Sequence, residues 1–416
     1  MNPARKSLVT STFSGMFLWG VIASIAPLGK SWPFVPDTGI FRILLVVIGP
    51  SFSLFGSFLM GFVSDYIGRR KIFIATIALY SIGLAVISLS YSVFSLLFGI
   101  ALSHFGVAGE EIPTISLLAE DSTKESRGSL VTNGMNFSNI GSAFIAGVFL
   151  FISLGNFPLL YQRLAIGIMA ILLVCLIIYS RIKLPESFRW LGVKGRGKES
   201  SQLSKELDIE TSDNEGNHPS RPFSLRYFVL GSMALSQYLT FGLMAYIIPY
   251  YEFSSATKID YLVFFGLLGA SIAGPFAGRL ISSGRKLFTL LSFAGGLFSV
   301  LMILLVLNSL GNLLVYVPLL FVNMVFSEFA WAARTTLEPE LFRTGTRGRG
   351  IALVRVIPMV AYPITIVLFA NFSLGQEIVS NIILWIIGLA GAAVWFFYGY
   401  ETKKMELDHR PESSGI

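Results

Sequence analysis

A series of long apolar runs constrains this chain more than any other feature of its sequence. A helix needs about 20 apolar residues to cross the hydrocarbon core of a bilayer, and these runs repeatedly reach that length. Only α-helices and closed β-barrels satisfy their backbone hydrogen bonds in lipid. The runs lack the alternating pattern of barrel strands, so they are expected to be helices. The sequence therefore predicts an all-α membrane protein with twelve transmembrane helices, near 8–28, 40–62, 72–91, 93–119, 129–154, 161–182, 223–250, 260–281, 287–307, 313–334, 350–371 and 378–399.

Composition excludes several other classes of protein. Hydrophobic residues make up 54% of the chain and charged residues only 13%, which leaves too little polar surface to coat a soluble globule. The net charge of +7 does not indicate nucleic-acid binding, because the basic residues lie in short loops between the apolar runs. The single cysteine, Cys175, allows neither an internal disulfide nor a cysteine-based metal site, so we expect no metal and no cofactor.

The distribution of Lys and Arg predicts the orientation of the chain. Of the 31 basic residues, all but four lie on the side of the predicted spans that holds the N-terminus. Because basic loops stay on the inner side, we expect a multi-pass protein of the cell membrane with both termini cytoplasmic. The run after Arg5 and Lys6 has no small-residue cleavage site and favours a retained first helix. The four exceptions are Lys30, Arg42, Arg163 and Lys258.

One extended polar stretch divides the chain into two similar parts. We expect an N-terminal six-helix half at 1–183, a cytoplasmic linker at 184–222, a C-terminal six-helix half at 223–400 and a cytoplasmic tail at 401–416. Charged loops recur at matching places in both halves, which indicates an internal duplication. Gly68-Arg69-Arg70 recurs as Gly284-Arg285-Lys286, Glu120 and Arg127 recur as Glu340 and Arg347, and Glu186 recurs as Glu401.

The loop between the second and third spans reads Gly61-Phe62-Val63-Ser64-Asp65-Tyr66-Ile67-Gly68-Arg69-Arg70-Lys71. Similar loops follow the fourth span as Arg127-Gly128, the sixth as Pro185-Glu186-Ser187-Phe188-Arg189-Trp190-Leu191, and the twelfth as Glu401-Thr402-Lys403. The ordered set resembles the major facilitator superfamily, most closely its sugar-porter and metabolite:proton symporter branches. The resemblance covers both halves and implies a transporter that works by alternating access, not an enzyme.

The resemblance also implies ion-pair networks that close the cytoplasmic side and gate transport without binding the solute. The alternative is that these residues are solvated loop charges, each pair contributing little. The residues concerned are Gly61, Asp65, Gly68, Arg69, Arg70, Glu120, Arg127, Glu186, Arg189, Arg285, Glu340, Arg347 and Glu401.

Departures from the sugar-porter pattern leave the solute open. The loop between the eighth and ninth spans corresponds to the Gly61–Lys71 loop but has Ile281 and Ser282 where an acid is expected. After the twelfth span, Tyr400-Glu401 lacks the usual proline. The seventh span keeps one glutamine, Gln237, but not the glycine and asparagine of that pattern, and the first span contains no acid.

Two adjacent acids lie inside the fourth span, where ionisable residues mark functional sites. Glu110 and Glu111 point about 100° apart on a helix, so one is expected to face the central cavity and the other a neighbouring helix. We expect Glu111 to face the cavity together with His104, and to exchange protons because burial disfavours its ionised form. The proton-coupling candidates are Glu111, Glu110 and His104; the alternative is that the acids pair with a base and only tie helices together.

Polar and aromatic residues in other spans are candidates for binding the solute. Arg355 in the eleventh span is expected either to form an ion pair with a glutamate of the tenth span or to bind an anionic solute through its guanidinium group. Amides and phenols suit hydroxyl-bearing or ring-shaped solutes, although they also join helices. The candidates are Gln237, Tyr246, Tyr250, Asn136, Asn139, Trp19, Glu328, Trp331 and Arg355.

The function that these features favour is secondary active transport of a small organic metabolite, either sugar-like or an organic acid, by proton-coupled symport. Its partners would be the solute, protons and membrane lipid, with the chain acting as a monomer. Alternatives are an exporter of drugs or organic ions and a membrane sensor that has lost turnover. A membrane enzyme is disfavoured because no nucleophile–base pair is evident and His104, His218 and His409 are far apart.

Overall fold

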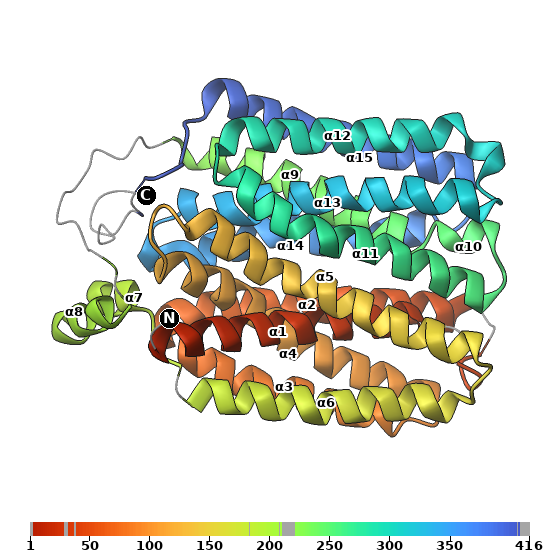
Figure 1. Cartoon of the computed structure of the whole chain (residues 1–416), viewed down its shortest axis with the longest axis horizontal. Helices are drawn as coiled ribbons and strands as arrows, with labels where there is room; N and C mark the ends of the chain where they lie inside the picture. The colour runs from red at the N-terminus through yellow and green to blue at the C-terminus, as the bar shows by residue number, and fades with distance from the viewer. Residues whose placement is uncertain are drawn as a thin grey trace.

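The computed structural model describes residues 3–28, 32–36, 39–182, 184–207, 209, 221–405 and 407. Twelve long helices run side by side along its longest axis (Figure 1). All twelve are long and apolar enough to cross a membrane, which confirms the predicted spans. They are α1 (Pro3–Leu28), α2 (Gly39–Ile67), α3 (Arg69–Ser88), α4 (Val93–Glu120), α5 (Arg127–Leu154), α6 (Leu159–Ile182), α9 (Phe223–Tyr246), α11 (Ala256–Ile281), α12 (Arg285–Leu305), α13 (Leu313–Leu341), α14 (Arg347–Leu368) and α15 (Leu374–Tyr398).

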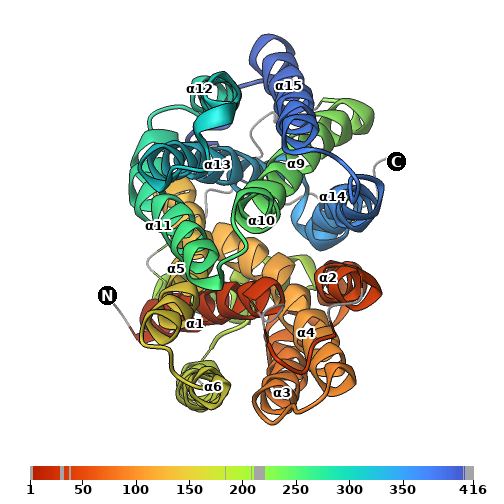
Figure 2. The ribbon, with the colours of Figure 1, turned by 90° about the vertical axis from the view of Figure 1, so that its right-hand side faces the viewer.

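The helices form two bundles, which lie one above the other when the molecule is viewed along its long axis (Figure 2). Helices α1 to α6 form the first bundle and α9 to α15 the second. The closest contacts between them are those of α5 with α11 and of α2 with α14. Glycine permits the second contact, because a Cβ atom added to Gly348 would lie 2.6 Å from the carbonyl oxygen of Gly61. Gly61 therefore contributes close packing between the halves.

The segment between the bundles contains two short helices, α7 (Phe188–Val193) and α8 (Gly197–Glu206). The sequence predicted a polar linker here, but Phe188, Trp190, Leu191, Leu203 and Leu207 form a small buried cluster with Ile209. Positions 208 and 210–220 of the predicted linker lie outside the described residues. Helices α7 and α8 project from the end of the molecule where α1 begins and α15 ends, which we call the linker end (Figure 1).

Two helices extend beyond the predicted ends of their spans at the linker end. Helix α2 continues to Ile67 and α13 continues to Leu341, so Asp65, Glu338 and Glu340 are helical. A hydropathy profile ends a span at such charged residues, but here each carboxylate is buried and paired with an arginine. Three shorter elements complete the described fold: α10 (Pro249–Glu252), η2 (Leu307–Ser309) and η3 (Thr344–Thr346).

Candidate functional site

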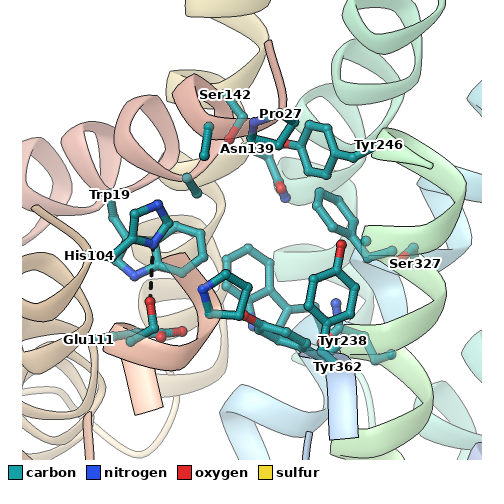
Figure 3. Close-up of a pocket in the computed structure, with 18 of the residues that line it drawn as sticks. Trp19, Pro27, His104, Glu111, Asn139, Ser142, Tyr238, Tyr246, Ser327 and Tyr362 are labelled. Carbon is teal, nitrogen blue, oxygen red and sulfur yellow. Dashed lines mark hydrogen bonds between the residues drawn. The ribbon is translucent and has the colours of Figure 1, made fainter. Parts of the chain in front are cut away.

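A cavity of about 100 Å³ lies between the two bundles. Trp19, His104 and Glu111 line one wall, and Tyr238, Tyr246 and Tyr362 lie across the cavity from them (Figure 3). Asn139, Gln237, Ser327, Glu328, Trp331 and Arg334 also line it. The cavity therefore combines aromatic faces with a few polar groups from both halves, as small-molecule sites commonly do.

A chain of buried ion pairs forms part of the cavity wall. The Arg355 guanidinium lies 2.5 Å from a Glu111 oxygen and 3.2 Å from a Glu338 oxygen. Glu338 also pairs with Arg334 at 2.5 Å, one helical turn away on α13. Arg334 in turn donates to the side-chain oxygen of Gln237 on α9 at 3.3 Å. These four charged side chains are at most 3% exposed, and their two positive and two negative charges balance.

The Glu111–Arg355 pair joins the two halves, because Glu111 lies on α4 and Arg355 on α14. A buried charge without a partner is costly, so each member of this pair depends on the other half for compensation. An Arg–Glu pair across the tenth and eleventh spans does exist, but its acid is Glu338 and not Glu328. Arg355 is not among the cavity-lining residues, since two carboxylates hold its guanidinium.

Glu110 faces away from the cavity, into the first bundle. Its carboxylate pairs with Arg181 on α6 and accepts a hydrogen bond from Thr76 on α3 at 3.3 Å. This arrangement matches the helix-tying alternative for one of the two acids. His104 does line the cavity: its Nδ1 lies 3.1 Å from the Ser53 hydroxyl, and its Nε2 has no partner within the described ranges.

Six of the predicted solute-binding residues line the cavity, and three do not. The six are Trp19, Asn139, Gln237, Tyr246, Glu328 and Trp331. Among the other three, the Asn136 amide donates to the carbonyl of Ser271 at 2.8 Å, joining α5 to α11. The Tyr250 hydroxyl, on the short helix α10, donates to the carbonyl of Pro27 at 3.2 Å. Both contacts bridge the halves, so these residues act in packing here, as Arg355 acts in ion pairing.

Sequence reasoning missed several residues of this site. Glu338 fell outside the predicted tenth span, although it is the acid between two buried arginines. Tyr238, Tyr362 and Ser327 line the cavity but are common residue types in apolar helices, with no motif to mark them. The available signal for Glu338 was its spacing of four residues from Arg334, which places both side chains on one helix face.

At the linker end, two carboxylates organise matching clusters of buried charges. Glu120 lies 3.0 Å from Arg69 of its own half and 2.6 Å from Arg347 of the other half. Glu340 repeats this arrangement, at 3.1 Å from Arg285 and 3.5 Å from Arg127. These side chains are at most 2% exposed, so they are not the solvated loop charges of the alternative interpretation.

Backbone amides bind the other acids of these loops. Glu186 accepts hydrogen bonds from the amides of Arg69, Arg70 and Ser187, and Glu401 likewise accepts from those of Arg285 and Lys286. Burial raises the pKa of the Glu186 carboxyl above its ordinary value, and the amides act in the opposite direction. Arg189 donates to the carbonyl oxygen of Glu120 at 2.6 Å. Gly68 has a φ of 97°, which favours glycine where the chain turns toward Glu186.

Asp65, whose equivalent position in the second half is Ile281, adds a further contact between the halves. Its two oxygens accept hydrogen bonds from the amides of Gly348 at 3.2 Å and Arg349 at 2.9 Å, at the start of α14. A carboxylate at the first turn of a helix is also favoured by the helix dipole. Asp65 therefore stabilises the closed arrangement of the linker end.

Replacing Asp65 by asparagine is expected to slow transport by roughly tenfold, because the weakened contact shifts the balance between conformations by about 1.4 kcal/mol. Solute affinity should change little, since Asp65 does not line the cavity. Turnover and the dissociation constant, measured on the same reconstituted protein, check both parts. The matched control is Glu199→Gln, an exposed acid on α8 that pairs with Arg196, the residue just before this helix. A large loss of solute affinity with normal turnover in Asp65→Asn would contradict this prediction.

Two bundles of six spanning helices, a buried cavity between them and ion pairs that close one end define a membrane protein of the transporter type. The chain belongs to the Major Facilitator Superfamily, whose family model matches residues 8–365. This confirms the resemblance inferred from the charged loops.

The chain is similar to three transport proteins of Bacillus subtilis (strain 168). It is 29% identical to the putative metabolite transport protein YncC over 208 residues, and 26% identical to the major myo-inositol transporter IolT over 218 residues. These alignments cover 48% and 50% of this chain but only 43% and 45% of the relatives. The putative niacin/nicotinamide transporter NiaP is 23% identical over 359 residues, 85% of each chain. The relatives are transport proteins, not enzymes.

Solved structures show the same fold. The proton:xylose symporter XylE bound to 6-bromo-6-deoxy-D-glucose superimposes with a TM-score of 0.79 at 16% identity, covering 97% of this chain and 98% of that one. A partially occluded inward open form of XylE from E. coli gives a TM-score of 0.70, covering 96% and 98%.

Proposed function

We propose that this chain is a monomeric secondary active transporter of the cell membrane that moves a small organic metabolite by alternating access, coupled to proton symport. The observation that carries the proposal is the buried Glu111–Arg355 pair, which joins the two halves and whose acid lines the central cavity. In this proposal the linker end is cytoplasmic, both termini lie on that side, and lipid surrounds the twelve helices.

Protonation of Glu111 would couple the proton to the movement of the halves. A charged Glu111 is attracted by Arg355 on the opposite half, whereas a neutral Glu111 loses most of that attraction. Arg355 still contacts Glu338 on its own half, but Glu338 also pairs with Arg334, so protonation of Glu111 leaves one excess positive charge in this network. The tie between α4 and α14 is therefore the contact that a proton can weaken, which lets the halves rock about the cavity.

The polar lining supports a metabolite as the solute. Gln237, Asn139 and Tyr246 offer amide and hydroxyl groups to a hydroxylated or ring-shaped molecule. Myo-inositol and niacin/nicotinamide in the names of two relatives, and xylose in that of the structural neighbour, are small solutes of this kind. An organic acid bound through Arg355 is less favoured, because both sides of that guanidinium are already paired.

Reconstitution of the full chain into proteoliposomes tests the proposal. Vesicles would be given a pH gradient and a mixture of labelled myo-inositol, xylose, nicotinamide, nicotinate and choline, and the accumulated solutes identified. We expect at least one solute to accumulate, and a protonophore to abolish this accumulation. Counterflow of the same mixture is the second measurement, and binding without any exchange would show a sensor instead of a transporter.

A further inference from the structure

Glu328 is a cavity-lining acid that the proton-coupling proposal does not use. It lies on α13 and is 2% exposed. The Asn139 amide donates to its Oε2 atom at 2.6 Å. Across the described ranges, no Lys, Arg or His side chain forms an ion pair with Glu328, and its Oε1 atom has no hydrogen-bond partner.

The other charges of the cavity wall are already compensated. Glu111 and Glu338 balance Arg334 and Arg355 through direct contacts. Glu328, when ionised, therefore adds a negative charge that no described residue of the cavity wall compensates, and a positive partner is needed to hold a carboxylate ionised at this burial.

Aromatic faces surround the same space. Trp331 lies three residues after Glu328 and so faces the same side of α13, while Tyr238, Tyr246 and Trp19 line the cavity from other helices. Aromatic rings attract cations through the negative potential of their faces, most strongly away from water. The Ser327 hydroxyl and the Trp19 indole nitrogen, both of cavity-lining residues, are buried without partners among the described residues.

We infer that the solute of this cavity is a small organic cation, whose positive centre binds Glu328 between the aromatic faces. The inference rests on the proposed transport function and specifies the charge of its solute. The cavity is small, which suits a small amine or quaternary ammonium compound. An anion would be repelled by Glu328, and a neutral polyol would leave its charge uncompensated.

Binding of choline and of 3,3-dimethyl-1-butanol to the purified full chain tests this inference, because the two molecules share a shape and differ in charge. Tryptophan fluorescence reports binding, since Trp19 and Trp331 line the cavity. We expect choline to bind at least about tenfold more tightly than its neutral analogue. Myo-inositol and nicotinate serve as the neutral polyol and the anion. Equal affinity for the neutral analogue, tighter binding of either comparison solute, or no saturable binding of choline would overturn the inference.

Glu328→Gln provides a second, independent measurement. It should lower choline affinity at least about tenfold and leave affinity for the neutral analogue nearly unchanged. The matched control is Glu377→Gln on α15, since Glu377 is also a buried acid without an ion pair in the described chain but does not line the cavity. Unaltered choline affinity in Glu328→Gln would contradict the inference, and the comparison in the unmodified chain stands even where this variant fails to fold.

Counterflow separates this inference from the proposed function. Exchange of myo-inositol or nicotinate without exchange or binding of choline would overturn the cation site and leave the transporter intact. Charge-selective choline binding with no exchange of any solute would support the site and contradict the transport function.

Discussion

Glu111→Gln is expected to abolish proton-driven accumulation of the solute and to preserve its counterflow. Glutamine has a similar shape but cannot take up or release a proton, so the tie to Arg355 no longer responds to pH. In the unmodified chain, one proton per solute supports up to about tenfold accumulation for each unit of pH gradient. In the variant, the internal and external solute concentrations should become equal. Accumulation ratios in proteoliposomes at two pH gradients check this expectation.

Glu110→Gln is the matched control, because it makes the same chemical change one residue away. Glu110 pairs with Arg181 inside the first bundle and does not line the cavity. This variant should retain pH-driven accumulation per folded molecule, although the loss of a buried pair lowers its stability. An unchanged proton dependence in Glu111→Gln would reject Glu111 as the coupling residue, and loss of coupling in Glu110→Gln alone would assign the coupling to Glu110.

Glu338→Gln is expected to lower the free energy of unfolding by about 3–5 kcal/mol, the usual cost of removing one partner from a buried ion pair. Glu338 contacts both Arg334 and Arg355, and its loss leaves two buried guanidinium groups with only Glu111. Thermal unfolding of the purified protein measures this effect.

A double variant tests whether charge balance is the cause. Adding Arg334→Met to Glu338→Gln removes one positive charge together with one negative charge, so much of the lost stability should return. The double-mutant cycle gives the coupling energy between the two positions. Arg196→Gln with Glu199→Gln is the control, since removing that exposed pair at the start of α8 should change stability little. A double variant less stable than Glu338→Gln would show that side-chain packing, not charge, explains the loss.

The linker-end clusters could be predicted from sequence because they follow local motifs. Glycine, arginine and acid recur at matching places in both halves, and the structure brings Glu120 to Arg69 and Glu340 to Arg285 in the same way. The reciprocal contacts, Glu120 with Arg347 and Glu340 with Arg127, depend on how the halves dock. The linker helices were missed because their apolar cluster is too small to produce a clear periodicity.

The partners of Arg355 could not be predicted in the same way. One of its ion pairs joins α14 to α13, the preceding spanning helix, and the other joins it to α4, which is distant in sequence and belongs to the other half. Tyr250 and Asn136 are suitable residue types for binding a solute, yet both contact backbone carbonyls of the opposite half. Residue type and position within a span do not distinguish a cavity-facing side chain from one at a helix interface.

The sequence by itself determined that the chain crosses a membrane twelve times in two related halves, because the length of each apolar run and the charges of the loops are local properties. Only the tertiary structure decided which side chains meet at the cavity. A spanning helix is apolar toward lipid and toward its neighbours alike, so hydrophobicity does not set its rotation about its own axis. Packing against the neighbouring helices set that rotation, and it placed Glu111 and Glu328 in the cavity wall and Glu110 behind it.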